Sequence, residues 1–219
     1  ALAFFTSAYS SYSGCRQYRE DIARAQGEVG ERAPEVEKLR VFYNHPGFIE
    51  PNVENVRAAL NKIPEERRES AQIAFTAHSI PLAMADTSDY EKQLRETCRL
   101  VAEGISHKNW RLVFQSRSGP PTQAWLEPDI LDYLTELKGA GTTDVVIAPV
   151  GFISDHMEVI YDLDTEARAL SEKLGLNMVR ASTVGAHPTF VKMIRELVIE
   201  RMNPDLPKRY LGIHGPSHD

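Results

Sequence analysis

Short apolar runs and longer stretches of helical spacing alternate along the whole chain. The runs predict strands buried on both faces, and the other stretches place apolar residues three and four positions apart, as helices do. The predicted strands are residues 1–6, 38–43, 72–77, 109–115, 145–150 and 177–181. The predicted helices are residues 14–26, 46–62, 89–105, 128–138, 188–202 and one that begins near residue 155, with Pro128 fitting the first helical position of its helix. The alternation predicts an α/β fold, a parallel sheet with helices on both faces as in a Rossmann-like lobe.

Residues 144–166 contain the most apolar predicted strand and, directly after it, an acidic helix. On that helix Glu158, Asp162 and Glu166 are spaced four residues apart, so the three carboxylates share one face. Like charges at this spacing weaken a helix by a few tenths of a kcal/mol per pair. A functional row of carboxylates and a plain solvated acidic face both fit this pattern, and the helix by itself favours the solvated face.

His78 follows the predicted strand 72–77 and precedes a turn that contains Pro81. Ligands of parallel sheets bind where the strands end, so a histidine here is placed to face a ligand as a base or a metal ligand. A histidine that only caps the strand is the alternative. Glu158 comes from the loop after another strand, and if both strands are central the two side chains converge on one cleft. Such a pair would suit a divalent cation and proton removal.

Other side chains near the same edge are less specific. Tyr9, Tyr12, Tyr18 and Trp125 offer aromatic surface for a flat ligand, although packing beneath loops explains them equally well. His156 lies two residues before Glu158 and is expected to point away from it, so we assign it a structural or surface role.

The two cysteines also differ. Cys98 lies on the apolar stripe of its helix and is expected to be a buried packing thiol. Cys15 stands at the start of a predicted helix, where backbone N–H groups stabilise a thiolate. Two cysteines far apart give no disulfide framework, and we expect a cytoplasmic protein.

Composition excludes several classes of partner. The 219 residues are 42% hydrophobic and 26% charged, as in a globular protein with a sizeable core. The net charge of −6 argues against nucleic acid, and no apolar run approaches the length of a transmembrane segment. The glycines match neither a P-loop nor a G-x-G-x-x-G motif. The chain starts inside a predicted strand and ends in the Gly/Pro/His-rich residues 212–219, so we expect both ends to be truncated.

Five motifs together give the chain a strong resemblance to the ferrochelatases, within them to the actinobacterial coproporphyrin III type. The motifs are F-T-A-H-S-I-P at 75–81, F-Q-S-R-S-G-P at 114–120, W-L-E-P at 125–128, P-V-G-F-I-S-D-H-M-E-V-I-Y-D at 149–162 and Y-S-S-Y-S-G-C-R-Q-Y-R-E at 9–20. Their order and spacing extend the resemblance over essentially the whole chain.

The resemblance implies a chelatase-type fold and a lyase that inserts Fe²⁺ into coproporphyrin III, giving Fe-coproporphyrin III in haem biosynthesis. It assigns catalysis and metal binding to His78 and Glu158, and a line of acidic metal ligands behind them to Asp162 and Glu166. Its porphyrin-contacting segment makes Tyr18 a candidate substrate-binding residue. The implied partners are the porphyrin and ferrous iron, and the oligomeric state stays open.

The same segment makes Tyr9, Ser10 and Tyr12 weaker candidates for porphyrin contacts. Many actinobacterial relatives bind a [2Fe–2S] cluster with one ligand at the position of Cys15, and the three others lie in a tail that these 219 residues do not contain. The resemblance therefore implies an iron–sulfur ligand in Cys15 and no complete cluster from this chain.

The resemblance also divides the chain. Residues 1–185 would form the carboxyl-terminal chelatase lobe, residues 186–206 a helix packing toward a missing amino-terminal lobe, and residues 207–219 a tail. Two alternatives stay open: a non-catalytic module that binds tetrapyrroles or metal, and a related chelatase acting on cobalt or sirohaem precursors.

Overall fold

The centre of the fold is a four-stranded parallel sheet in the order β4-β3-β5-β6. In this computed structural model, which describes residues 1–120 and 122–216 apart from the side chains of 13–15, the strands match four of the predicted ones. They are β3 (Gln72–His78), β4 (Trp110–Gln115), β5 (Asp144–Ala148) and β6 (Asn177–Arg180). Every residue of β5 is buried, as a central parallel strand requires. The prediction of an α/β fold is confirmed.

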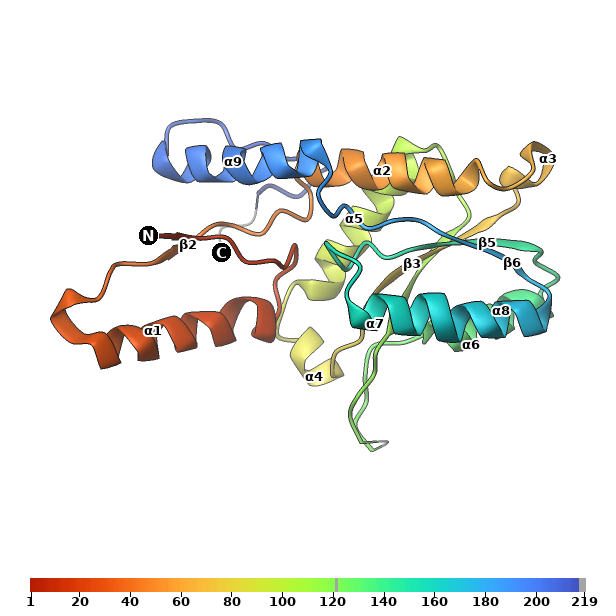
Figure 1. Cartoon of the computed structure of the whole chain (residues 1–219), viewed down its shortest axis with the longest axis horizontal. Helices are drawn as coiled ribbons and strands as arrows, with labels where there is room; N and C mark the ends of the chain where they lie inside the picture. The colour runs from red at the N-terminus through yellow and green to blue at the C-terminus, as the bar shows by residue number, and fades with distance from the viewer. Residues whose placement is uncertain (121, 217–219) are drawn as a thin grey trace.

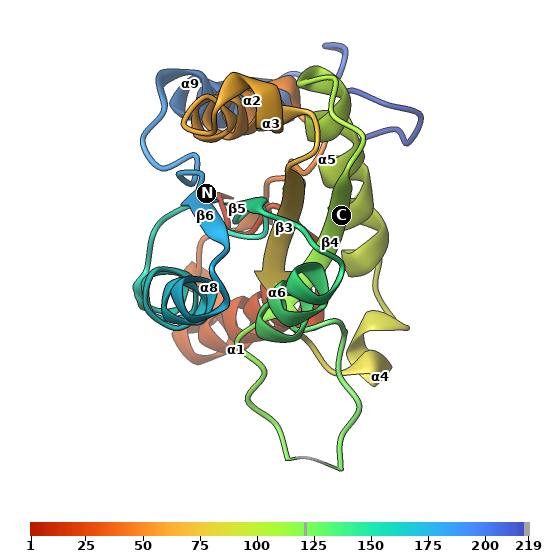
Figure 2. The ribbon, with the colours of Figure 1, turned by 90° about the vertical axis from the view of Figure 1, so that its right-hand side faces the viewer.

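Helices cover both faces of the sheet (Figure 2). One layer consists of α2 (Pro46–Leu60), α5 (Tyr90–Gly104) and α9 (Pro188–Met202). The opposite layer consists of α6 (Ile130–Gly139), α7 (Met157–Val159), the π-helix η3 (Ile160–Ala167) and α8 (Arg168–Leu174). Two short helices, α3 (Glu65–Arg68) and α4 (Leu82–Ala85), precede β3 and follow it.

Strand periodicity decides which layer each side chain faces. Ile73, Phe75 and Ala77 of β3 belong to the core beneath α2 and α5, whereas Ala74 belongs to the core beneath α6 and η3. Because successive strand residues alternate between faces, Thr76 and His78 share the second face with Ala74. The last residue of β3 therefore points toward the acidic segment that contains Glu158.

The amino-terminal part projects from this body (Figure 1). It contains β1 (Leu2–Ala3), the π-helix η1 (Tyr12–Gln17), α1 (Tyr18–Val29), the short η2 (Gly30–Arg32) and β2 (Glu37–Lys38). β1 and β2 form a parallel pair of two residues each, so the longer strands expected at 1–6 and 38–43 are wrong. Residues 39–43 are buried in the core. The Leu39 N–H donates to the Ala3 carbonyl, and beyond it no strand among the described residues pairs with this segment.

One helix start also differs from the prediction. Pro128 precedes α6 instead of occupying its first position, and a cis peptide joins it to Glu127. The cap is Asp129, whose carboxylate accepts the Leu131 N–H at 2.8 Å. A carboxylate at this position satisfies an N–H that the helix leaves open, which is why α6 begins one residue after it.

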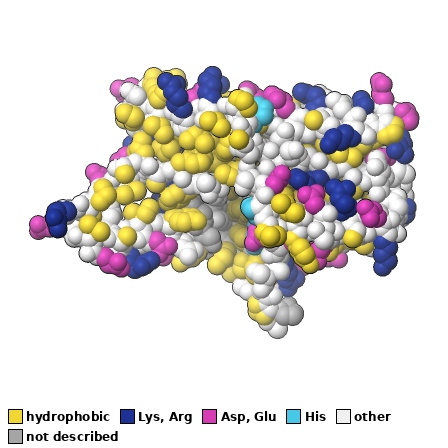
Figure 3. All heavy atoms as spheres, viewed as in Figure 1, with side chains coloured by type: hydrophobic (Ala, Val, Ile, Leu, Met, Phe, Trp, Pro, Cys, Tyr) yellow, Lys and Arg dark blue, Asp and Glu magenta, His cyan; other side chains and the backbone are white. Residues whose placement is uncertain are grey.

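The surface is divided unevenly between apolar and charged side chains. Figure 3 shows apolar side chains gathered on the half formed by α9, β1 and α1, while charged side chains crowd the other half. Exposed apolar residues of that first half include Leu2, Val29, Val191 and Met202. No helix among the described residues is long and apolar enough to cross a membrane.

Candidate active site

His78 is held rigidly at the end of β3. Its Nδ1 lies 2.5 Å from the carbonyl oxygen of Ser79, and the Tyr90 hydroxyl donates to the His78 carbonyl at 3.0 Å. A carbonyl oxygen only accepts, so Nδ1 carries a proton and, in the neutral ring, Nε2 carries the lone pair. The ring therefore presents its basic nitrogen outward, in the tautomer that a base or a metal ligand needs.

Glu158 of α7 lies opposite this nitrogen. Its Oε2 is 3.9 Å from Nε2 of His78, and about half of its side chain is exposed. A lone pair and a carboxylate facing each other repel unless a proton or a cation lies between them. The structure thus brings together the two residues on which the sequence analysis centred, in an arrangement suited to holding positive charge.

Asp162 lies on η3, the π-helix that follows α7, and contacts the end of β4. Its Oδ2 accepts a hydrogen bond from Gln115 Nε2 at 3.1 Å and one from the Ser116 hydroxyl. The sequence predicted an ordinary helix here, but the Arg168 N–H reaches back five residues to the Leu163 carbonyl, as in a π-helix. Such wide turns occur often at functional sites. Glu166, near the end of η3, is exposed.

Charge pairing separates this carboxylate row from its neighbours. Asp155 and Asp164 both pair with Arg180, at 3.1 and 2.7 Å. Within residues 1–120 and 122–216, Glu158, Asp162 and Glu166 have no lysine or arginine within ion-pair distance. The row is therefore a candidate surface for a cation.

The four residues do not, however, form one ready-made chelate. In the described part of the chain, no group of three or more His, Cys, Asp and Glu side chains is arranged to hold a metal ion. His78 and Glu158 form a pair, and Asp162 and Glu166 continue from it along η3. A cation bound by such a pair would need further ligands.

A cleft of about 440 Å³ opens beside His78. Tyr9 and Tyr18 both line it, but they differ in burial, at 1% and 51% exposed. The Tyr9 hydroxyl donates to the Val150 carbonyl at 2.8 Å, and burial raises the pKa of Tyr9 well above its usual value. Tyr18 packs against Phe5 with ring centroids 4.9 Å apart and offers its outer face to a ligand.

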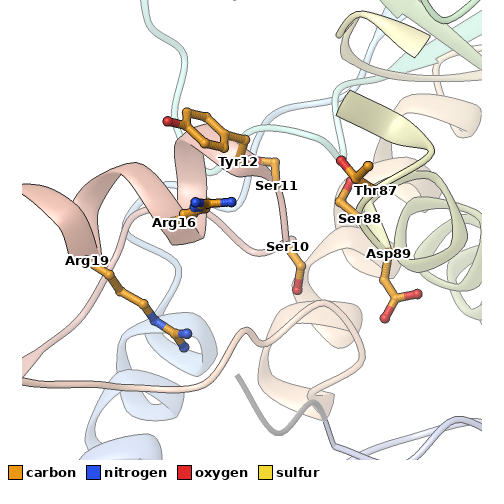
Figure 4. A pocket seen from close by; sticks show the side chains of 8 residues that line it. All are labelled: Ser10, Ser11, Tyr12, Arg16, Arg19, Thr87, Ser88 and Asp89. Atoms are coloured by element: carbon orange, nitrogen blue, oxygen red, sulfur yellow. The ribbon is translucent and has the colours of Figure 1, made fainter. Parts of the chain in front are cut away.

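Ser10 and Tyr12 face a second pocket, of about 410 Å³, that shares Ser11 with the first (Figure 4). Ser10 is buried, and its hydroxyl accepts from Gln93 Nε2 at 2.9 Å. Tyr12 is 40% exposed. The four candidates for porphyrin contacts are thus distributed over two adjoining pockets.

Gly151 allows β3 and the chain after β5 to approach closely. Its N–H donates to the Thr76 carbonyl at 2.9 Å. A Cβ at this position would lie 2.5 Å from Cα of Ala77, well inside contact distance. Only glycine fits at this close passage, which brings the chain that leads to Glu158 directly against the end of β3.

The structure also places His156 and Trp125. His156 lines the same cleft as His78 and packs edge-on against Phe152, so its residue spacing from Glu158 was a poor guide. The reason is that α7 begins only at Met157, and the helical rule does not apply before it. Trp125 is buried under the loop after β4, at 8% exposed, and offers no face for stacking.

The two cysteines were assigned different roles from the sequence. Cys98 is a free, fully buried thiol, as predicted, and burial raises its pKa. The Cys15 side chain lies outside the described residues. The iron–sulfur clusters implied by the resemblance take four cysteines, and these 219 residues contain two, so they do not complete such a cluster by themselves.

Comparison with known proteins agrees with the fold and the motifs. A family model for ferrochelatase matches residues 1–202. The chain belongs to the ferrochelatase family. A ferrochelatase of Rhodopirellula baltica is 55% identical over all of this chain and 62% of its own length. A coproporphyrin III ferrochelatase of Frankia alni is 49% identical over 99% of this chain and 59% of its own length.

The chain therefore spans about three fifths of the length of these ferrochelatases. Among solved structures, SirB of Bacillus subtilis with Fe³⁺ is similar with a TM-score of 0.58. That match covers 92% of this chain and 72% of SirB at 16% identity, which shows a shared chelatase fold.

Proposed function

We propose that the protein to which this chain belongs inserts ferrous iron into a porphyrin, with coproporphyrin III as its substrate. The observation that carries the proposal is the pair of His78 Nε2 and Glu158 Oε2, 3.9 Å apart. His78 lines a cleft, and carboxylates without a lysine or arginine partner follow Glu158 along η3. Membership of the ferrochelatase family and the named activity of the Frankia relative support it.

Metal insertion makes two chemical demands on a protein. Two pyrrole N–H protons must leave the macrocycle, and the metal ion must exchange its water ligands for four ring nitrogens. The free Nε2 of His78 is able to accept a proton or bind the ion, since its Nδ1 proton is fixed on Ser79. Glu158 can do the same from the other side, and its exposure leaves it a path for passing protons to water.

The row of carboxylates supports a route for the metal. Asp162 and Glu166 lead away from Glu158 along η3 and carry no cationic partner in the described part of the chain. Oxygen ligands of this kind bind hydrated divalent ions weakly and release them readily. We propose that ferrous iron approaches along this row toward the pair of His78 and Glu158.

The macrocycle would occupy the cleft that Tyr9 and Tyr18 line. Tyr9 supports the floor of the cleft from within the core, while the exposed ring of Tyr18 is free to lie against the porphyrin. Ser10 and Tyr12 belong to the adjoining pocket and would meet the periphery of the ring.

A further part of the protein would complete the cleft. We propose that the apolar side chains of α9 and β1, among them Val191, Met202 and Leu2, pack against an additional lobe that precedes residues 1–219 in the whole protein. The greater length of the related ferrochelatases supports this arrangement. A cytoplasmic location is part of the same proposal, since the Cys98 thiol is unpaired.

The test is an anaerobic insertion assay on the protein expressed from its complete coding sequence. Coproporphyrin III, protoporphyrin IX and sirohydrochlorin are each supplied with Fe²⁺, and insertion is followed by the change in absorption spectrum. We expect the highest kcat/KM with coproporphyrin III. Tight binding without insertion would favour the non-catalytic module, and faster insertion into sirohydrochlorin would favour a sirohaem-type chelatase. Either result would overturn the proposal.

A further inference from the structure

The pocket beside the porphyrin cleft has the composition of an anion site. It is lined by the hydroxyl residues Ser10, Ser11, Thr87 and Ser88, by Tyr12 and Asp89, and by two arginines, Arg16 and Arg19. Figure 4 shows both arginines extending from the helix toward the hollow, with the loop of Thr87, Ser88 and Asp89 on its far side. We propose that this pocket binds one carboxylate substituent of the tetrapyrrole held in the neighbouring cleft. The inference rests on the proposed function and adds Arg16 and Arg19 to the substrate-binding residues.

Position is the first argument. The pocket and the cleft that contains His78 share Ser11 as a common wall. A macrocycle lying in the cleft would therefore bring its edge to the opening of the pocket. The edge of coproporphyrin carries propionate side chains, which are long enough to leave the plane of the ring and enter an adjoining hollow.

Charge is the second argument. Arg16 pairs with Glu20 at 2.8 Å and lies over the ring of Tyr12. Arg19, in contrast, makes no ion pair and no hydrogen bond with any part of the chain that the structure describes. An unpaired guanidinium at a pocket wall is a strong partner for a carboxylate, because its parallel N–H groups match the two oxygens.

The backbone adds to this charge. Helical structure runs without a break from Tyr12 through Val29, and Tyr12 at its start lines the pocket. The dipole of a helix favours an anion near its first turn. The opposing charge is Asp89, whose carboxylate lies 3.8 Å from the Lys92 ammonium.

The test uses metal-free binding, so that its readout is independent of insertion. Porphyrin fluorescence is titrated with the protein from its complete coding sequence, using coproporphyrin III and its tetramethyl ester in the same detergent. We expect Arg19→Gln to weaken binding of the acid about 5- to 10-fold and to leave binding of the ester unchanged. Arg16→Gln should have a smaller effect, since Glu20 already engages that guanidinium, and Asp89→Asn should tighten binding of the acid.

Arg24→Gln is the matched control. It removes the same charge from the same helix, but Arg24 pairs with Asp21 and Glu28 and does not line the pocket. An equal effect of Arg24→Gln and Arg19→Gln, or an equal loss for acid and ester, would overturn the inference.

Titration with inorganic phosphate tests a free anion as the alternative occupant. Saturable phosphate binding that needs Arg19, with coproporphyrin affinity unchanged in Arg19→Gln, would also overturn the inference. The proposed function fails separately, if the wild-type protein binds coproporphyrin III and inserts no iron into it.

Discussion

Nε2 of His78 and Oε2 of Glu158 lie 3.9 Å apart, although the two residues belong to different elements of the fold. His78 ends β3, while Glu158 follows β5 through a loop and the start of α7. The two strands pair directly, with Phe75 opposite Ala148, so their carboxyl ends lie side by side. Gly151, on the chain between β5 and Glu158, packs directly against Ala77, the neighbour of His78.

Removing either member of this pair should abolish insertion. We expect His78→Ala and Glu158→Gln each to lower kcat for iron insertion by at least ~100-fold, because a positioned proton acceptor contributes about that much or more. Porphyrin binding, measured by fluorescence, should change little. Glu172→Gln, an exposed change on α8, is the control for charge, and near-normal kcat in either site variant would contradict the assigned roles.

The carboxylates behind the pair should affect the metal more than the porphyrin. We expect Asp162→Asn and Glu166→Gln each to raise the KM for Fe²⁺ about 3- to 10-fold, with the KM for coproporphyrin nearly constant. The effect is modest because salt screens the attraction between Fe²⁺ and a single exposed carboxylate. Steady-state kinetics at low ionic strength measures both constants. Asp164→Asn, which removes a carboxylate already paired with Arg180, is the control, and equal changes in both KM values would count against a metal route.

Substitutions of the two tyrosines of the cleft should affect different properties, the stability of the fold for Tyr9 and porphyrin binding for Tyr18. Tyr9→Phe leaves the buried Val150 carbonyl without its donor, so we expect the free energy of unfolding to fall by about 1–2 kcal/mol. Tyr18→Ala removes an exposed ring and should weaken porphyrin binding with little loss of stability. Urea unfolding and porphyrin titration are compared for both variants. The assignment is contradicted if Tyr18→Ala binds porphyrin normally.

His45 should make the fold sensitive to acid. It caps α2 by accepting the Gly47 N–H, and burial, followed by repulsion from Arg40 and Arg209, lowers its pKa to about 3. An unfolded histidine has a pKa near 6.5, so between about pH 6.5 and 3 the unfolded state binds a proton that the folded state does not. The free energy of unfolding should therefore fall as the pH falls through this window, by up to about 1.4 kcal/mol per unit.

The slope of stability against pH is the measurement for this prediction. His45→Asn keeps a capping side chain and should flatten the slope, whatever it does to the absolute stability. His187→Asn is the matched control, since His187 caps α9 in the same way but is a quarter exposed. Parallel slopes for wild type and His45→Asn would show that another group causes the acid sensitivity.

The sequence determined the class of fold and the residues worth testing. Apolar runs such as 145–150, bounded by turn residues and rich in β-branched side chains, favour strands covered on both faces, and the four central strands lie close to their predicted places. The sequence could not predict where β1 and β2 end, because the length of a paired strand depends on the neighbouring strand that is present.

Only the tertiary structure decided which carboxylates of the acidic helix are paired with basic side chains. The spacing along the sequence places Glu158, Asp162 and Glu166 on one face, but it cannot reveal whether a lysine or arginine side chain lies near them. The folded chain brings Arg180 to Asp155 and Asp164 and leaves the other three without such a partner among the described residues, while β3 brings His78 to Glu158. Pairing between side chains distant in sequence is set by strand order and close backbone packing, and these are properties of the whole fold.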